Sequence, residues 1–239
     1  LRYAVSPRFA PTSTQEQLRA ASQLLREYPS IHLHTHLSEN KEEINWVNSL
    51  FPDCKSYLNV YEHAGLLRRR STLAHCLHLT ETDWKILRDK ECSVAFCPSS
   101  NLFLGSGLFD LPRAQAVDVN VGIGTDVGAG TSLSILQTIS DAYKTQRLAG
   151  SDLSPFSALY MATLGGAKSL DCEADIGNFK IGKEADFIVL DPESTPIMKY
   201  RTQHCESLQE MLFGIALLGD DRAVSATYAN GRCVHRRDG

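Results

Sequence analysis

The chain has 239 residues, of which 43% are hydrophobic and 22% charged, an ordinary globular composition that suffices for one large domain with or without a small appendage. Its net charge of −4 gives no indication of a basic surface that would bind nucleic acid. The sequence contains no run of about 18 apolar residues, so we predict no membrane span. The seven cysteines are scattered, lack CxxC spacing and follow no secretory signal, so we expect reduced thiols in a cytoplasmic protein.

The start of the chain predicts the end of a strand, a loop and one helix. Residues 1–5 are a short apolar stretch, and Ser6-Pro7-Arg8-Phe9 follows as a loop. Ser13 and Glu16 have the spacing of a capping box at a helix start. Apolar residues then recur at helical spacing until Pro29, which ends the helix.

Residues 31–37 alternate apolar and polar side chains, which is the period of a β-strand. In such a strand His32, His34 and His36 face the same side. Taken alone, three alternating histidines can also be the polar face of an ordinary strand. Here, however, Glu39 follows the strand end and a capped helix begins at once. Barrel enzymes place their chemistry at strand ends of this kind.

Three further strands are predicted at residues 71–76, 93–98 and 119–126. Helices are predicted at these places: from Asn40 and Glu43 to Pro52, at residues 56–67, after the cap formed by Thr80 and Asp83, at residues 133–148, and from Ser154-Pro155 to a break at Gly165-Gly166. Strands that alternate with helices predict βα units and a parallel sheet, and five such units are expected before about residue 170.

The sequence pattern of the last part of the chain differs from that of the βα units and predicts a small β-rich module. Residues 176–190 have the pattern of turns followed by a strong strand, and residues 207–218 have that of a helix. Residues 223–236 predict a hairpin whose two-residue turn is Asn230-Gly231.

Three predicted strand ends carry side chains suited to metal-dependent hydrolysis, namely His36 with Glu39, His75 and Asp126. Their separation is too long for a local zinc finger, so they meet only if their strands are neighbours in one barrel. There they would form a mixed imidazole and carboxylate site with an open position, which suits a catalytic divalent ion. Such an ion lowers the pKa of bound water, and Glu39 is placed to shuttle protons.

With these motifs in place, the chain resembles the amidohydrolase superfamily and, within it, the guanine deaminase family. The resemblance covers nearly the whole chain and rests on these segments: Ser6-Pro7-Arg8-Phe9, Thr35-His36-Leu37-Ser38-Glu39-Asn40, Ala74-His75-Cys76, Cys97-Pro98-Ser99-Ser100-Asn101-Leu102, Gly124-Thr125-Asp126-Val127-Gly128, Ala162-Thr163-Leu164-Gly165-Gly166-Ala167, the tail stretch IGNFKIGKEAD and Leu218-Gly219-Asp220-Asp221-Arg222. The His, His and Asp strand ends indicate the superfamily. Pro7-Arg8-Phe9 together with His36-Leu37-Ser38-Glu39-Asn40 narrows it to the guanine deaminases.

The resemblance implies an α/β fold, with a partial TIM-type (β/α)8 barrel of about strands 4–8 at residues 1–172 and a small C-terminal β-rich module with a helix at residues 173–239. It implies a zinc-dependent hydrolase of purine catabolism that converts guanine and water to xanthine and ammonia. It also implies one zinc ion per site and a homodimer.

The resemblance further implies roles for single residues. His36 resembles the family's strand-5 zinc ligand, and Asp126 resembles the strand-8 aspartate that binds zinc and takes the proton of the water. Glu39 resembles the proton shuttle. His75 resembles the strand-6 histidine that contacts the substrate or the hydrolytic water.

Arg8 and Phe9 resemble the pair that holds the guanine ring by hydrogen bonds and stacking. One family feature is missing, because the superfamily's first strand carries a His-x-His pair of zinc ligands well before the equivalent of Arg8. His34-Thr35-His36 looks like that pair, but the downstream motifs follow it in the order of strands 5, 6 and 8. His32 and His34 are therefore expected to have no metal role. We expect a piece of a longer enzyme, or a chain that takes the missing part from another chain.

Two alternatives remain open at the level of sequence. The chain could belong to another amidohydrolase that acts on an aminated or halogenated heterocycle, such as a triazine hydrolase. It could also be an inactive fragment that binds a purine or a partner and does no chemistry. Metal content together with a turnover assay separates these readings.

Overall fold

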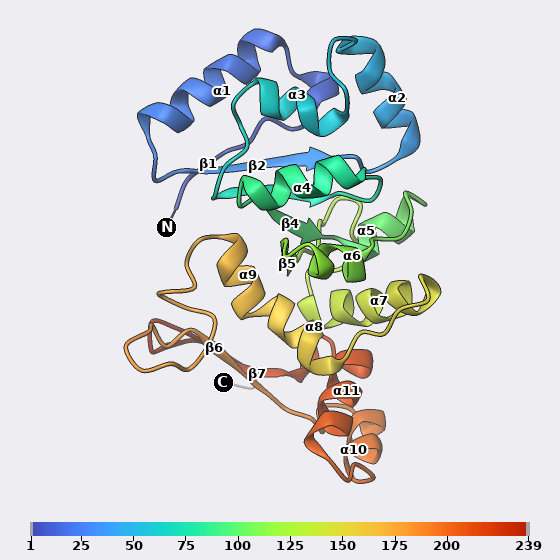
Figure 1. Cartoon of the computed structure of the whole chain (residues 1–239). Coiled ribbons are helices and arrows are strands. Elements are labelled where there is room, and N and C mark those ends of the chain that lie inside the picture. Colours follow the sequence, from blue (N-terminus) through green and yellow to red (C-terminus); the bar gives the residue numbers. More distant parts are fainter. Residues whose placement is uncertain (1, 238–239) are drawn as a thin grey trace.

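The computed structural model describes residues 2–237 and contains two separate β-sheets with helices packed around them (Figure 1). The larger sheet has five parallel strands, each hydrogen-bonded to the next along the chain: β1 (Ala4–Val5), β2 (His32–Leu37), β3 (Ser71–His75), β4 (Ser93–Phe96) and β5 (Asn120–Ile123). The prediction of an α/β fold with five parallel strands is confirmed.

Helices occupy the connections of this sheet and the segment after it. They are η1 (Ala10–Thr12), α1 (Gln15–Glu27), α2 (Lys41–Leu50), α3 (Tyr57–His63), α4 (Glu81–Asp89), α5 (Pro98–Phe103), α6 (Leu111–Ala116), α7 (Ile135–Leu148), α8 (Pro155–Ala162) and α9 (Leu164–Ser169). The sequence pattern does not predict α5 and α6, because each has only 6 residues and too few turns to show helical periodicity. Within residues 2–237, no helix is both long and apolar enough to cross a membrane.

The main core lies between the larger sheet and its covering helices. The alternation predicted for β2 is present, because Leu33, Thr35 and Leu37 are buried, whereas His34 is exposed and His36 is half-buried. Fully buried side chains of neighbouring strands and helices continue this core: Leu73, Val94, Phe96, Leu25, Leu58, Leu87 and Phe109. Burying such side chains is the main favourable contribution to folding, at roughly 1.5–3 kcal/mol each.

Two predicted helix starts are confirmed by complete capping boxes. The side chain of Asn40 accepts a hydrogen bond from the Glu43 backbone, and Glu43 accepts one from the Asn40 backbone. Thr80 and Asp83 form the same reciprocal pair at the start of α4. The first of these boxes fixes where β2 ends and α2 begins, directly beside the predicted site.

The capping box predicted at Ser13 and Glu16 is wrong by one residue. The N-cap of α1 is Thr14, whose hydroxyl accepts a hydrogen bond from the Gln17 backbone at 3.1 Å. Ser13 instead donates to the Phe9 carbonyl at 2.9 Å, because η1 precedes the helix and turns Ser13 back toward the loop. Adjacent Ser and Thr residues compete for the same capping position, and the sequence pattern does not decide between them.

The break predicted at Gly165-Gly166 is also wrong in position. The chain breaks at Thr163, and both glycines lie inside α9. A side chain on Gly165 would place its Cβ 3.0 Å from the Val121 carbonyl on β5. These glycines therefore serve the close approach of α9 to the sheet and do not end a helix.

The smaller sheet is antiparallel and consists of β6 (Phe187–Leu190), β7 (Val224–Ala229) and β8 (Arg232–Arg236). The predicted hairpin is confirmed, and its turn residues Asn230 and Gly231 have φ values of 48° and 74°, the conformation that an Asn-Gly turn favours. The remaining helices of this part are α10 (Pro196–Thr202), α11 (Leu208–Leu218) and η2 (Asp221–Ala223).

A second, smaller core joins the two parts of the chain. It contains Leu136 of α7 together with Met198, Ile215 and Ala223 from the last part. Because α7 precedes residue 172, this core crosses the predicted boundary between residues 1–172 and 173–239. The division into two domains stays a prediction.

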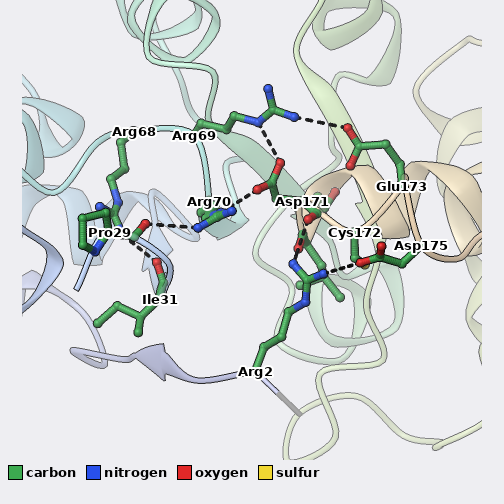
Figure 2. Close-up of polar contacts among 12 residues, drawn as sticks. Arg2, Pro29, Ile31, Arg68, Arg69, Arg70, Asp171, Cys172, Glu173 and Asp175 are labelled. Atoms are coloured by element: carbon green, nitrogen blue, oxygen red, sulfur yellow. Dashed lines mark hydrogen bonds and ion pairs between the residues drawn. The ribbon is translucent and has the colours of Figure 1, made fainter.

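A cluster of ion pairs ties the start of β3 to the segment after α9 (Figure 2). Arg69 Nε donates to Asp171 Oδ1 at 2.7 Å, and Arg70 Nε donates to the other carboxylate oxygen. Arg2 donates to the Asp175 carboxylate at 2.7 Å and to the Asp171 carbonyl at 2.8 Å. We refer to the following residues as the Asp171 cluster: Arg2, Arg69, Arg70, Asp171, Glu173 and Asp175. The cluster holds together three segments that are far apart in the sequence.

Candidate active site

Three strand ends converge at the C-terminal edge of the larger sheet. His36 lies in β2, His75 ends β3, and Asp126 follows β5. Each of these residues offers one potential ligand atom, and the three atoms all lie within 4.8 Å of one another. The rings of His36 and His75 are stacked with centroids 5.3 Å apart, and His75 Nε2 is 3.9 Å from Asp126 Oδ2. The structure therefore brings together the three residues that the sequence places at separate strand ends.

The backbone leaves the extended conformation at His75, the last residue of β3, and at Asp126, three residues after β5. His75 has a φ of 72° and Asp126 a φ of 50°, which is the left-handed region. Histidine and aspartate are among the non-glycine residues that enter this region most readily. β3 ends at His75 and β5 ends at Ile123, so these two side chains lie at the edge of the sheet and not on its packed face.

The hydrogen bonds of the two imidazoles leave one nitrogen of each ring free toward the site. His36 Nδ1 lies 2.7 Å from the Arg8 carbonyl oxygen, which can only accept, so Nδ1 carries the proton. His75 Nδ1 lies 2.9 Å from Asn101 Oδ1 and donates to it in the same way. His75 Nε2 is buried and has no hydrogen-bond partner among the described residues. A buried nitrogen lone pair without a partner fits a ring that holds a metal ion or a water molecule.

Asn101 is a site residue that the sequence interpretation missed. It lies on α5 directly after β4, it is 1% exposed, and it orients the His75 ring. Its position shortly after the predicted strand at residues 93–98 was the available signal, because His36, Glu39, His75 and Asp126 also lie at or shortly after strand ends.

Glu39 lies at the mouth of the site, two residues after β2. Its side chain is 15% exposed, and its Oε2 is 3.7 Å from His75 Nε2. Ser106, from the loop after α5, donates to Glu39 Oε1 at 3.3 Å. Glu43 accepts a hydrogen bond from the Glu39 backbone at 3.0 Å and so fixes the peptide that carries the side chain. Glu39 is thus held beside the histidines while part of its carboxylate stays open to solvent.

Arg8 and Phe9 lie beside His36 on the loop after β1. The Phe9 ring centroid is 6.1 Å from that of His36, and the edge of Trp46 meets Phe9 at 6.4 Å. The Arg8 side chain is exposed, with its guanidinium 4.9 Å from the Phe9 ring centroid. The structure places the Phe9 ring next to His36 and the Arg8 cation over the Phe9 ring.

His32 and His34 are not part of this group. Among residues 2–237, the only group of three or more side chains that could hold a metal ion is His36, His75 and Asp126. Burial lowers the pKa of His32, with the nearby positive charges of Arg2 and Arg70 adding to the effect. His32 is therefore a neutral buried ring, while His34 is exposed on the same face of β2 as His36.

Two cysteines close to site residues, Cys97 and Cys76, have thiols whose pKa is raised. Burial raises the pKa of Cys97 to about 12, and the charge of Asp126 adds to the effect. Burial also raises the pKa of Cys76 well above its ordinary value. No cysteine of the described residues joins the group of potential ligand atoms from His36, His75 and Asp126, so the donor set of this site consists of imidazole and carboxylate.

Comparison with known proteins places this geometry in a family. The model of the amidohydrolase family matches residues 1–234. The chain therefore belongs to the amidohydrolase family.

Individual relatives have narrower names than the family model. The chain is 52% identical over 238 residues to guanine deaminase of Escherichia coli (strain K12), covering 100% of this chain and 54% of that protein. The solved structure of the E. coli enzyme matches with a TM-score of 0.98 and 56% of its chain covered. Guanine deaminase from C. acetobutylicum with bound guanine is 29% identical with a TM-score of 0.85, covering 96% of this chain and 54% of that one. An adenosine deaminase from Xanthomonas campestris with bound zinc is 25% identical with a TM-score of 0.83, covering 97% and 51%. The chain spans about half the length of the curated relatives it matches.

Proposed function

We propose that this chain supplies two of the metal ligands, the proton shuttle and the base-holding loop of a guanine deaminase, which hydrolyses guanine to xanthine and ammonia. The observation that carries the proposal is the convergence of His36, His75 and Asp126 within 4.8 Å, with Glu39 beside them. The likeness to enzymes named guanine deaminase supports the choice of substrate.

The donor set fits a zinc ion. His36 and Asp126 would hold it, because an imidazole and a carboxylate with an open position suit a catalytic zinc site. When bound, such an ion lowers the pKa of a coordinated water toward neutrality. Asp126 would take the proton of that water, and His75, with its unpartnered Nε2, would contact the water or the substrate.

Deamination also needs a proton on the ring nitrogen and on the leaving amine. Glu39 is the acid and base in this proposal, since its carboxylate lies next to His75 and is open enough to reach a substrate. The hydrogen bonds from Ser106 and to Glu43 hold it in place without using both carboxylate oxygens.

Arg8 and Phe9 would bind the guanine ring. The planar guanidinium of Arg8 can donate two hydrogen bonds to the carbonyl edge of a purine, and Phe9 offers an aromatic face or edge to the ring. Both residues are next to His36, so a purine held there lies beside the proposed ligands.

A chimera tests the proposal. The part of the E. coli enzyme that this chain does not cover is placed before residue 1. Zinc content, ammonia release from guanine and adenine, and chloride release from a chlorinated triazine are then measured. We expect the chimera to contain zinc and to turn over guanine, but neither adenine nor the triazine. Glu39→Gln should remove the turnover, whereas Glu42→Gln, an exposed control on α2, should not. A zinc-loaded chimera that leaves guanine intact, or prefers the triazine, would contradict the proposal.

A cytoplasmic location and a homodimer belong to the same proposal. All seven cysteines lie in the described part of the chain and are free, which suits a reducing compartment. Light scattering of the chimera would test the dimer.

A further inference from the structure

The hydroxyl of Tyr61 lies behind the proposed metal site and bonds to both of the segments that build it. Tyr61 is on α3 and is 0% exposed. Its hydroxyl donates to the His36 carbonyl at 2.8 Å and accepts a hydrogen bond from the Ala10 backbone at 3.0 Å. The Thr35 hydroxyl is 3.1 Å away. One buried oxygen thus contacts the end of β2 and the loop that carries Arg8 and Phe9.

The Arg8 carbonyl is the second shared point of these segments. It accepts hydrogen bonds from the His36 backbone at 3.2 Å, from His36 Nδ1 at 2.7 Å and from the Thr35 hydroxyl at 3.2 Å. The orientation of the His36 ring therefore depends on where the Arg8 peptide lies. Tyr61 fixes that peptide from both sides, through Ala10 in the loop and through the His36 carbonyl in the strand.

Tyr61 is itself held by a buried chain of polar groups. Its hydroxyl is 3.4 Å from that of Tyr57, one helical turn earlier on α3. Tyr57 donates to Glu43 Oε1 at 2.8 Å, and Glu43 Oε2 accepts from the Glu39 backbone at 3.0 Å. The same chain thus ends at the peptide of the proposed proton shuttle.

We propose that Tyr61 is a positioning residue that makes the base-holding loop and the metal-binding end of β2 move as one unit. The effects that we expect on guanine and zinc binding rest on the proposed function. The anchoring of the two segments by one hydroxyl rests on the hydrogen bonds of Tyr61 alone. Without the hydroxyl, the Arg8–Phe9 loop and the His36 ring lose their common anchor. The binding of guanine and of zinc should then weaken together.

The test compares Tyr61→Phe with Ser71→Ala. Ser71 is the matched control because its hydroxyl is equally buried, donates to the Leu66 carbonyl at 2.8 Å and accepts from the Arg68 backbone at 3.2 Å. It lies at the opposite end of β3, away from the site. Each variant removes one buried hydroxyl with two comparable bonds, so a general loss of stability should be similar.

Three quantities are measured in the chimera: zinc affinity by titration calorimetry, amide hydrogen exchange at His36, and KM and kcat for guanine. For Tyr61→Phe we expect guanine KM and the zinc Kd each to rise about tenfold, the effect of one lost buried hydrogen bond. At saturating zinc and guanine, kcat should stay within about threefold, because no reacting group is removed. Exchange at the His36 amide should accelerate although its own acceptor, the Arg8 carbonyl, is still present.

Ser71→Ala should leave KM, zinc Kd and His36 exchange unchanged. If Tyr61→Phe matches Ser71→Ala in these quantities, or if only one of KM and zinc Kd rises, the coupling is wrong. If Tyr61→Phe does not fold, amide exchange in the wild type decides the question: the Ala10 and His36 amides should open with the same free energy, and clearly different opening free energies would contradict the coupling. A chimera without activity would count against the proposed function alone, since zinc affinity and amide exchange still report on Tyr61.

Discussion

Replacing Asp171 by Asn should destabilise the fold far more than a surface charge change usually does. The Asp171 side chain is 14% exposed and accepts hydrogen bonds from both Arg69 and Arg70, so the variant leaves two guanidinium groups with a neutral partner. Exposed ion pairs contribute about 0–1 kcal/mol, and breaking a fully buried one costs about 3–5 kcal/mol. Arg70 is 30% and Arg69 58% exposed, so we expect an intermediate loss of about 2 kcal/mol.

The matched control is Asp175→Asn in the same cluster. Asp175 is 54% exposed and pairs with Arg2, which is 43% exposed, so this variant should cost less than about 1 kcal/mol. For a chain of this size, a loss of about 2 kcal/mol lowers Tm by about 4–8 °C. Thermal unfolding followed by circular dichroism at pH 7 measures both variants. Equal Tm values for the two variants would refute the reasoning, because burial would then have no influence on the cluster.

The pH dependence supplies a second check of the same prediction. Partial burial alone would raise the pKa of Asp171, but the hydrogen bonds and charges of Arg70 and Arg69 outweigh it and hold the pKa below its ordinary value of 3.8. A carboxyl group with a lowered pKa in the folded state stabilises the protein above the unfolded-state pKa. The advantage of the wild type over Asp171→Asn should therefore be constant above about pH 5 and shrink as the pH falls through the lowered pKa.

The remaining predictions concern the site. In the chimera, Glu39→Gln should lower kcat by about 10²–10⁴ with zinc content unchanged, whereas loss of zinc along with activity would make Glu39 a ligand. Arg8→Ala should raise the KM for guanine about ten- to a hundredfold, because a polar group of the ligand loses its partner, and unchanged kinetics would remove Arg8 from the site. The chain by itself should bind zinc weakly, since only His36 and Asp126 of the expected ligands are present; one-to-one zinc after dialysis would show that the ligand set is larger.

Strands and the main site residues could be predicted because their signals are local or follow from topology. Alternation marks β2 within a few residues, and parallel strands place their C-terminal ends at one edge of the sheet. That rule is enough to bring His36, His75 and Asp126 together without any knowledge of distances. The helix starts at Asn40 and Thr80 are likewise local, because both partners of each box are three residues apart.

The supporting residues could not be predicted in the same way. Asn101 acts through a hydrogen bond to His75, 26 positions away, and Tyr61 through bonds to His36 and Ala10, 25 and 51 positions away. No periodicity of the sequence encodes such pairs. The cap at Thr14 and the break at Thr163 depend on tertiary packing of η1 and α9, which overrides the local preference of Ser13 and of the glycines. Sequence patterns thus identify the groups that would perform chemistry more readily than the groups that hold them.

The close contact between α9 and β5 makes the site sensitive to side-chain volume at a distance. A Cβ on Gly122 would lie 2.9 Å from Ser169 Oγ and 3.2 Å from the Gly166 backbone, and a Cβ on Gly165 would lie 3.0 Å from the Val121 carbonyl. Even alanine would therefore push the helix from the strand that leads to Asp126, and overpacking of this kind costs about 1–3 kcal/mol. In a library of random variants, these glycines should tolerate as little change as the site residues themselves, although none of them touches a substrate. Engineering of substrate choice therefore has to leave the contact between α9 and β5 unchanged.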